Sequence, residues 1–136
     1  MIILIDTDIL LDVALQREPF FLHSAQILDN AENQEFIAYV AWHTLSNFYY
    51  LVSSSSGKDK TKQFLNDLLK FVKVSPTNTK SAKKALSLNV PDFEDALQMS
   101  AAIECNASYI ITRNTKHYKN SPVAALTPEK FLEKLI

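Results

Sequence analysis

The chain has 136 residues and a formal net charge of −1, so it can form one globular domain with a substantial core but carries no global basic field to recruit nucleic acid. Hydrophobic residues make up 47% and charged residues 21%, as in soluble proteins, and the apolar stretches are too short to cross a membrane or to act as a signal peptide. The chain has a single glycine, Gly57, which excludes the P-loop and the dinucleotide-binding fingerprint because each needs several glycines. It also has a single cysteine, Cys105, which excludes an internal disulfide and fits a reducing cytoplasm.

Four apolar residues, Ile2 to Ile5, open the chain without polar alternation, which is typical of a strand buried on both faces of a parallel sheet. Asp6, Asp8 and Asp12 follow, and a carboxylate at the carboxyl end of a central parallel strand stands where open α/β sheets bind ligands. Asp8 can cap the next helix, but the pattern offers Asp6 no such role, and an unpaired buried carboxylate is costly. We therefore expect Asp6 to be functional, Asp8 to support it, and Asp12 to lie exposed on a helix surface.

Helices and strands alternate along the rest of the chain. Apolar spacing predicts helices over about 8–17, 20–33, 41–52, 58–70, 78–88 and 90–106, and a last helix that begins at Pro128 after the cap Thr127. Short apolar runs predict further strands over 36–40, 71–74, 108–111 and 123–126. This order predicts an α/β fold for residues 1–136 as a single domain, a three-layer α/β/α sandwich around a mostly parallel sheet of four to five strands.

The predicted helix over 41–52 is dense in aromatic residues. Because aromatic side chains dominate buried area, we interpret Trp42, Leu45, Phe48, Tyr49 and Val52 as core residues and not as a platform for nucleic-acid bases. The serines that follow, up to Gly57, are typical of a flexible loop that is too short to link two domains.

Side chains with oxygen ligands stand at the ends of three predicted elements. They are Asp6 after the first strand, Asp92, Glu94 and Asp95 at the start of the helix within 90–106, and Thr112 and Asn114 after the strand over 108–111. Oxygen ligands favour a hard cation such as Mg²⁺ or Mn²⁺ over zinc, and His23, His43 and His117 show no zinc-ligand spacing.

A divalent ion would also solve an electrostatic problem of this set. Carboxylates of Asp6 and Asp95 about 5 Å apart would repel each other by roughly 3 kcal/mol at an effective dielectric constant near ~20. A bound cation, or a raised pKa, neutralises such a cluster. The cation can acidify a water molecule and stabilise charge on a phosphate, which is the chemistry of metal-assisted phosphodiester hydrolysis.

Three segments, LIDTDILLD at the start, PDFEDALQMSAA in the second half and YIITRN near the end, together resemble a PIN domain. The layout from Ile2 to Phe131 resembles the VapC-type toxin ribonucleases of toxin–antitoxin pairs. The resemblance implies a PIN fold and a Mg²⁺- or Mn²⁺-dependent endoribonuclease that cuts RNA. It also implies a homodimer and a protein antitoxin that blocks the active site.

The resemblance assigns roles to individual residues. Asp6 and Asp95 match the catalytic, metal-binding acids of the family, and Asp92 is a neighbouring candidate for both roles that helix capping explains equally well. Thr112 and Asn114 match the Thr-x-Asp/Asn element, with Asn114 at the catalytic position and Thr112 in support.

Two positions depart from the family pattern. Asn47 stands where the third helix usually carries a glutamate, and Asn114 replaces an aspartate. With fewer charges, the site is expected to bind metal more weakly, or to hold one ion where fuller sites hold two. These departures favour an alternative function, a degenerate PIN domain that binds RNA or a protein partner without cutting.

A haloacid-dehalogenase-like phosphatase is a rival enzyme class, because Asp6-Thr7-Asp8 matches its D-x-D opening and Ile110-Ile111-Thr112 resembles its second motif. That class needs a lysine and a late acidic pair after the threonine. Here the acidic cluster precedes Thr112 and no acid follows until Glu129, so we reject this reading.

The segment after the strand over 108–111 is basic, with Arg113, Lys116, His117 and Lys119. These side chains are candidates for contacts with RNA phosphates. Short basic runs are more often solvated loops, and the sequence alone leaves both readings open.

Overall fold

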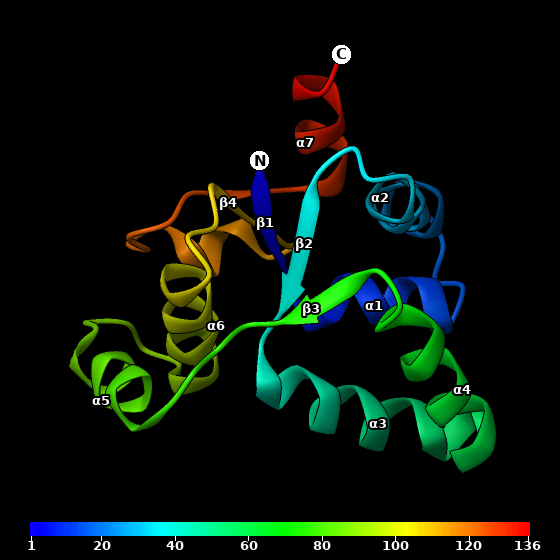
Figure 1. The fold of residues 1–136 in the computed structure, drawn as a ribbon, viewed down its shortest axis with the longest axis horizontal. Helices are drawn as coiled ribbons and strands as arrows, with labels where there is room; N and C mark the ends of the chain where they lie inside the picture. The colour runs from blue at the N-terminus through cyan, green and yellow to red at the C-terminus, as the bar shows by residue number, and fades with distance from the viewer.

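The computed structural model describes all residues from Met1 to Ile136, arranged around a sheet of five parallel strands in the order β3-β2-β1-β4-β5 (Figure 1). The strands are β1 (Ile2–Ile5), β2 (Ile37–Val40), β3 (Val72–Val74), β4 (Tyr109–Ile111) and β5 (Ala125–Leu126). The helices are α1 (Thr7–Ala14), α2 (Phe21–Glu32), α3 (Trp42–Ser56), α4 (Lys58–Leu68), α5 (Thr79–Ser87), α6 (Phe93–Glu104), the 3₁₀ helix η1 (Thr115–Tyr118) and α7 (Pro128–Lys134). None of them combines the length and the apolar character that a membrane-spanning helix requires.

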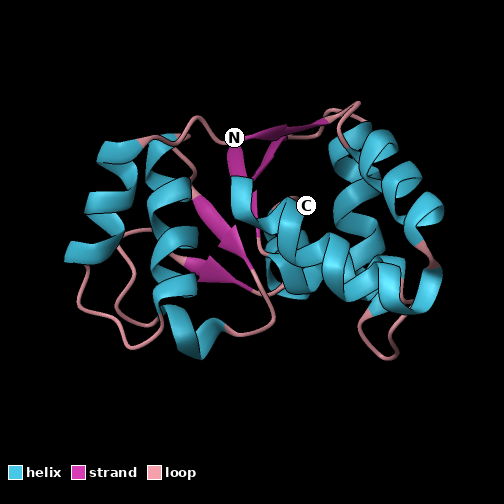
Figure 2. Ribbon diagram, turned by 90° about the horizontal axis from the view of Figure 1, so that it is seen from below, coloured by secondary structure: helices cyan, strands magenta, loops and turns pink.

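Helices pack on both faces of this sheet, as Figure 2 shows. Ile3 and Ile5 of β1 join a large core cluster with residues of α1, α2, α3, α4 and α7, whereas Leu4 between them joins a smaller cluster with α6. Successive side chains of a strand point to opposite faces, so a strand buried on both faces needs an uninterrupted apolar run. The predicted α/β/α sandwich with a parallel sheet is confirmed.

The strand order puts a ligand-binding edge next to β1. From β1 the chain adds β2 and β3 on one side and β4 and β5 on the other, so the connections diverge between β1 and β4. The backbone N–H of Asp6 donates to the carbonyl of Ile111 at 2.9 Å, which aligns the carboxyl ends of the two strands. Open α/β sheets bind ligands at this kind of position.

Helix capping by Thr127 and by Asp92, which the sequence predicts, is confirmed, although α6 begins at Phe93 and not at residue 90. Thr127 caps α7, its hydroxyl accepting from Lys130 N at 3.3 Å, and Pro128 occupies the first helical position. Asp92 caps α6 by accepting from Glu94 N at 3.0 Å.

The prediction of a flexible loop at the serine run is wrong. Helix α3 continues to Ser56, and only Gly57, with φ of +86°, separates it from α4. The hydroxyls of Ser54 and Ser55 donate to Leu51 and Val52 carbonyls one turn earlier, so these serines satisfy their polar groups within the helix.

The assignment of Trp42 to the core is also wrong. Trp42 is 69% exposed, while Phe48 and Val52 are buried as predicted and Leu45 packs partly buried against the same cluster. The buried stripe of α3 runs through Thr44, Phe48 and Val52 at four-residue spacing. Trp42 lies off that stripe, in the first turn of the helix.

Candidate functional site

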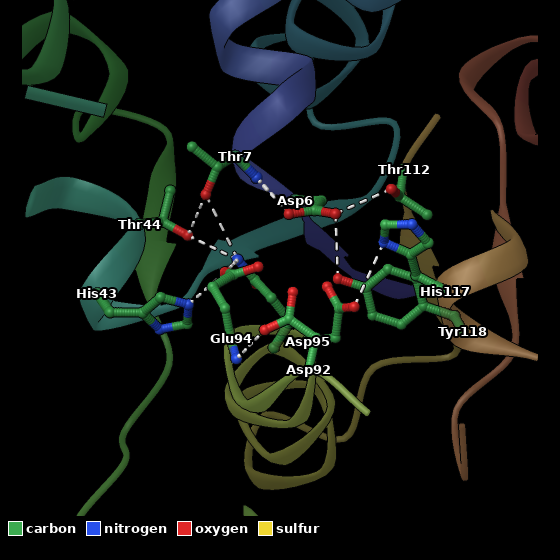
Figure 3. Close-up of polar contacts among 11 residues, drawn as sticks. Asp6, Thr7, His43, Thr44, Asp92, Glu94, Asp95, Thr112, His117 and Tyr118 are labelled. Atoms are coloured by element: carbon green, nitrogen blue, oxygen red, sulfur yellow. Dashed lines mark hydrogen bonds and ion pairs between the residues drawn. The ribbon is translucent and has the colours of Figure 1, made fainter. Parts of the chain in front are cut away.

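Five carboxylates gather in one cavity at the carboxyl ends of β1 and β4. The cavity has a volume of about 500 Å³. Its lining includes the carboxylates of Asp6, Asp8, Asp92, Glu94 and Asp95 and the amides of Asn47 and Asn114. Thr112 does not line it but is buried and bonded to Asp6 (Figure 3). The fold thus brings together all the candidate residues of the sequence, from α1, α3, α6 and the loop after β4.

Asp6 is held by three donors and is only 6% exposed. Its Oδ1 accepts from Thr7 N at 2.7 Å, while its Oδ2 accepts from Thr112 Oγ1 at 2.8 Å and from Tyr118 Oη at 3.0 Å. Asp6 is therefore the cap of α1, and the expectation that it had no structural role is wrong. Burial, and next the charge of Glu94, raise the pKa of Asp6 despite these hydrogen bonds.

Asp8 has one bonded oxygen and one free oxygen. Its Oδ2 accepts from Arg113 N at 3.0 Å and lies 3.4 Å from Asn114 Nδ2. Its Oδ1 is buried without a hydrogen-bond partner. Burial, and next the charge of Asp6, raise the pKa of Asp8 to about 7.

Asp95, in the first turn of α6, is 7% exposed and contacts a histidine from the opposite side of the cavity. Its Oδ2 lies 3.3 Å from Nδ1 of His117, which belongs to η1. Burial, and next the charges of Asp92 and Glu94, raise the pKa of Asp95 to about 6.

Glu94 differs from its neighbours in protonation. Burial favours its neutral form, but hydrogen bonds from His43 and Gln98 outweigh that effect, so the pKa of Glu94 lies below its ordinary value. In this cavity the pKa of Glu94 is therefore lowered, while the pKa values of Asp6, Asp8 and Asp95 are raised. A cation would favour the charged forms of these three carboxyl groups.

The donor chemistry of the cavity fits a hard divalent cation. Its donors are carboxylate and amide oxygens, and Asp8 Oδ1 is buried with no partner to satisfy it. No three acidic, histidine or cysteine side chains are already arranged around one ion position. A cation must compete with Thr112 and Tyr118 for Asp6. Since Mg²⁺ is commonly held by one or two carboxylates together with water and substrate phosphate, the fit rests on donor chemistry and not on a finished cage.

Arg113 is committed to a structural ion pair. Its Nε and Nη2 donate to the two carboxylate oxygens of Asp12 at 2.7 and 3.1 Å, and its guanidinium lies 3.9 Å from the ring centroid of Phe20. Asp12 is fully buried, so the expectation that it is exposed on a helix surface is wrong. Arg113 is therefore bound to Asp12 and does not face a cavity lined by the rest of the basic segment. The other basic side chains, Lys116, His117 and Lys119, line a second cavity.

That second cavity adjoins the first. It has a volume of about 320 Å³ and shares Asp92, Asp95 and His117 with the acidic cavity. Its remaining lining includes Lys116 and Lys119, neither of which forms an ion pair. The acidic cavity therefore adjoins a second cavity that contains two lysines without an ion-pair partner.

Sequence reasoning missed the groups that hold the site carboxylates. Tyr118 and His43 carry no recognisable sequence signal for their contacts with Asp6 and Glu94. Gln98 was detectable in part, because it follows Glu94 by four residues on the same helix, a spacing at which side chains meet.

The raised pKa of Asp8 predicts a pH dependence of stability. The pKa of Asp8 rises from 3.8 to about 7 on folding. The stabilisation that this shift gives to the folded state is therefore fully present below about pH 4 and is lost as the pH rises through 7. We expect the metal-free protein to melt at a lower temperature at pH 8 than at pH 5, and Asp8→Asn to reduce that difference. Thermal unfolding at both pH values, with the exposed Asp29→Asn as control, measures this. An unchanged difference in Asp8→Asn would show that Asp8 is not the responsible group.

Comparison with known proteins gives one family match. A family model described as the PIN domain matches residues 2–116 of the chain. No curated protein matches the sequence.

Several solved structures have a similar fold. VapBC2 from Rickettsia felis, bound to a DNA fragment from its promoter, has a TM-score of 0.68 and 20% identity over 93% of this chain and 98% of that chain. A toxin–antitoxin complex from Klebsiella pneumoniae has a TM-score of 0.70 and 21% identity over 92% and 96% of the two chains. Mycobacterium tuberculosis VapC20, described as a sarcin-ricin loop cleaving toxin, has a TM-score of 0.63 and 11% identity over 79% and 86%. At these identities the likeness is one of fold.

Proposed function

Because the chain belongs to the PIN-domain family, we propose that it is a single-domain endoribonuclease that hydrolyses RNA phosphodiester bonds with a bound Mg²⁺ or Mn²⁺ ion. The observation that supports this most is the cavity of five carboxylates at the carboxyl end of the central strand. The proposed catalytic residues are Asp6, Asp95, Asn114 and Asp92, the proposed metal-binding residues are Asp6, Asp95 and Asp92, and Asp8, Asn47 and Thr112 support them.

The chain itself orders the acids before an ion binds. Thr7 N, Thr112 and Tyr118 fix both oxygens of Asp6, and His117 contacts one oxygen of Asp95. Asp92 uses one oxygen to cap α6, which leaves its other oxygen for the cavity. When bound, the ion would lower the pKa of a coordinated water molecule and neutralise charge on the scissile phosphate.

The adjoining second cavity, with its two lysines, is the proposed path of the RNA backbone. Lys116 and Lys119 have no carboxylate partner there, so their charges are available to neighbouring phosphates. Since the net charge of the chain is −1, these two lysines would supply the local positive charge that a basic surface supplies in other nucleic-acid-binding proteins.

A protein antitoxin is the proposed partner, and a cytoplasmic homodimer the proposed state. Two of the structures with a similar fold are a VapBC assembly and a toxin–antitoxin complex. Tyr50 and Leu51 line the acidic cavity and are 73% and 55% exposed, as expected of a surface that a partner covers.

Cleavage of structured RNA by the purified protein, with Mn²⁺ or with a chelator, tests the proposal. Cleavage that requires Mn²⁺ supports it. Binding of RNA or of a protein partner without cleavage would instead support the degenerate binding module, which the neutral Asn47 and Asn114 favour.

Adding charge to the cavity is expected to tighten metal binding. Asn114 Nδ2 lies 3.4 Å from Asp8, and Asn47 lines the same cavity, so an aspartate at either position adds a carboxylate near the proposed ion. Because affinity for hard cations rises with ligand charge, we expect Asn114→Asp and Asn47→Asp each to lower the Kd for Mn²⁺ in calorimetry. Cleavage need not accelerate, since a tighter ion is not necessarily better placed. No change in either variant would mean that these two residues do not face the ion.

A further inference from the structure

The two oxygens of Glu94 have different surroundings. Its Oε2 accepts from His43 Nε2 at 2.7 Å and from Gln98 Nε2 at 3.0 Å (Figure 3). Oε1 accepts from no N–H group or hydroxyl and is not buried, and Glu94 lines the acidic cavity beside Asp95, whose side chain also hydrogen-bonds to Glu94 and lowers its pKa. One oxygen is therefore anchored to the protein, and the other is available to the cavity.

The anchor belongs to a buried polar network that joins three helices. Gln98 of α6 and Thr44 of α3 are fully buried. Gln98 Nε2 also donates to Thr44 Oγ1 at 3.0 Å, and Thr44 Oγ1 lies 3.0 Å from Thr7 Oγ1 on α1. Such a network costs desolvation, and Oε1 of Gln98 is left without a partner. A network that is costly for stability, placed beside the cavity, points to a role in orienting Glu94.

Glu94 differs from Asp6 and Asp95 in how its oxygens are bonded. Asp6 has both oxygens bonded to protein donors, and Asp95 has His117 against one of its oxygens. In Figure 3, Glu94 rises from the start of α6 toward the side of the site where His43 and Thr44 lie, beside Asp6.

We propose that Glu94 is a metal-facing residue of this cavity, with Oε1 directed to the ion, and that His43 is its positioning residue. This assignment rests on the proposed function, because it needs the divalent ion. His43 holds the carboxylate from α3, so the orientation of Glu94 depends on the packing of α3 against α6.

The first test is calorimetric binding of Mn²⁺ to the full chain in the absence of RNA. Glu94→Gln keeps the size of the side chain and an oxygen acceptor for His43, but removes the charge. We expect its Kd for Mn²⁺ to rise about ten-fold or more. Glu104→Gln, the same change at the far end of the same helix, is the matched control and should stay within about two-fold of the wild type. Circular dichroism and melting temperature verify that both variants fold.

The second test separates positioning from structure. If His43 acts through Glu94, His43→Ala should weaken Mn²⁺ binding in the wild type but add less than about two-fold in the Glu94→Gln background. Asn47→Glu in the same background returns a carboxylate to the cavity and should recover at least part of the lost affinity.

The outcomes distinguish this assignment from the proposed function. If the wild type binds Mn²⁺ and Asp6→Asn does not, but Glu94→Gln matches Glu104→Gln, then Glu94 does not face the ion and only this assignment falls. Full additivity of His43→Ala and Glu94→Gln would overturn the positioning role. If the wild type neither binds Mn²⁺ nor cuts RNA, both the assignment and the proposed function are overturned.

Discussion

Replacing Asp6 with asparagine is expected to lower the rate of RNA cleavage about 100-fold or more, the size of loss seen when one preorganised electrostatic group leaves a site. Asp6 lies at the carboxyl end of the central strand, where the Thr112 and Tyr118 hydroxyls and the backbone of Thr7 hold it. The asparagine oxygen can still accept from Thr7 N, and both hydroxyls can turn to accept from its amide group. The variant should therefore lose the charge at this position while its side chain keeps the same position and hydrogen-bond partners. Cleavage of structured RNA in Mn²⁺ measures the effect.

Stability measurements provide the control for this variant. Burial raises the pKa of Asp6, so the folded protein resists its ionisation, and we expect Asp6→Asn to melt at the same or a slightly higher temperature at pH 7 without metal. It should also lose the stabilisation that Mn²⁺ gives to the native state by mass action. Asp29→Asn, on the exposed side of α2, should change neither property. Cleavage at the wild-type rate, with contaminating nuclease excluded, would contradict the role of Asp6. A clear fall in melting temperature would mean that its hydrogen bonds matter more than its charge.

The fold could be predicted because its signals are local. The four consecutive apolar residues Ile2 to Ile5 are enough to indicate a strand that is buried on both faces. The Thr127-Pro128 pair indicates a helix start, because the threonine side chain caps the helix and proline has a helical backbone angle. The serine run before Gly57 misled because serine serves in both loops and helices. Its hydroxyls bond back along α3, which composition does not reveal.

The clustering of the candidate residues could be predicted, but the contacts that support them could not. Asp6 and Thr112 follow neighbouring strands of one sheet, so the topology alone brings them together. The partner of Glu94 on α3 lies 51 residues away, and that of Asp12 in the loop after β4 lies 101 residues away. Such pairs depend on how helices and loops pack against one another, whereas amphipathic spacing predicts only which face of a helix is apolar. A buried Asp12 therefore looked like an ordinary surface acid.

Replacing Arg113 with methionine is expected to lower the free energy of unfolding by about 3 kcal/mol, because it leaves the carboxylate of Asp12 buried without its cation. Methionine retains an apolar contact with the ring of Phe20, so the loss reports the ion pair more than the packing. Ser24, which donates to Asp12 at 3.2 Å, is the remaining side-chain donor and cannot neutralise the charge. Urea unfolding at pH 7 measures the change.

Lys116→Met is the matched control, since Lys116 lies in the same segment but is exposed and forms no ion pair; it should change stability by less than about 0.5 kcal/mol. Adding Asp12→Leu to Arg113→Met removes the orphaned charge and should recover much of the loss, because apolar replacements of a buried pair are often neutral or stabilising. The pair also affects the cavity, since the backbone N–H of Arg113 donates to Asp8. We therefore expect Arg113→Met to weaken Mn²⁺ binding as well, and the double variant to restore stability more fully than metal affinity. If Arg113→Met is as stable as Lys116→Met, the ion pair does not hold this loop against α1.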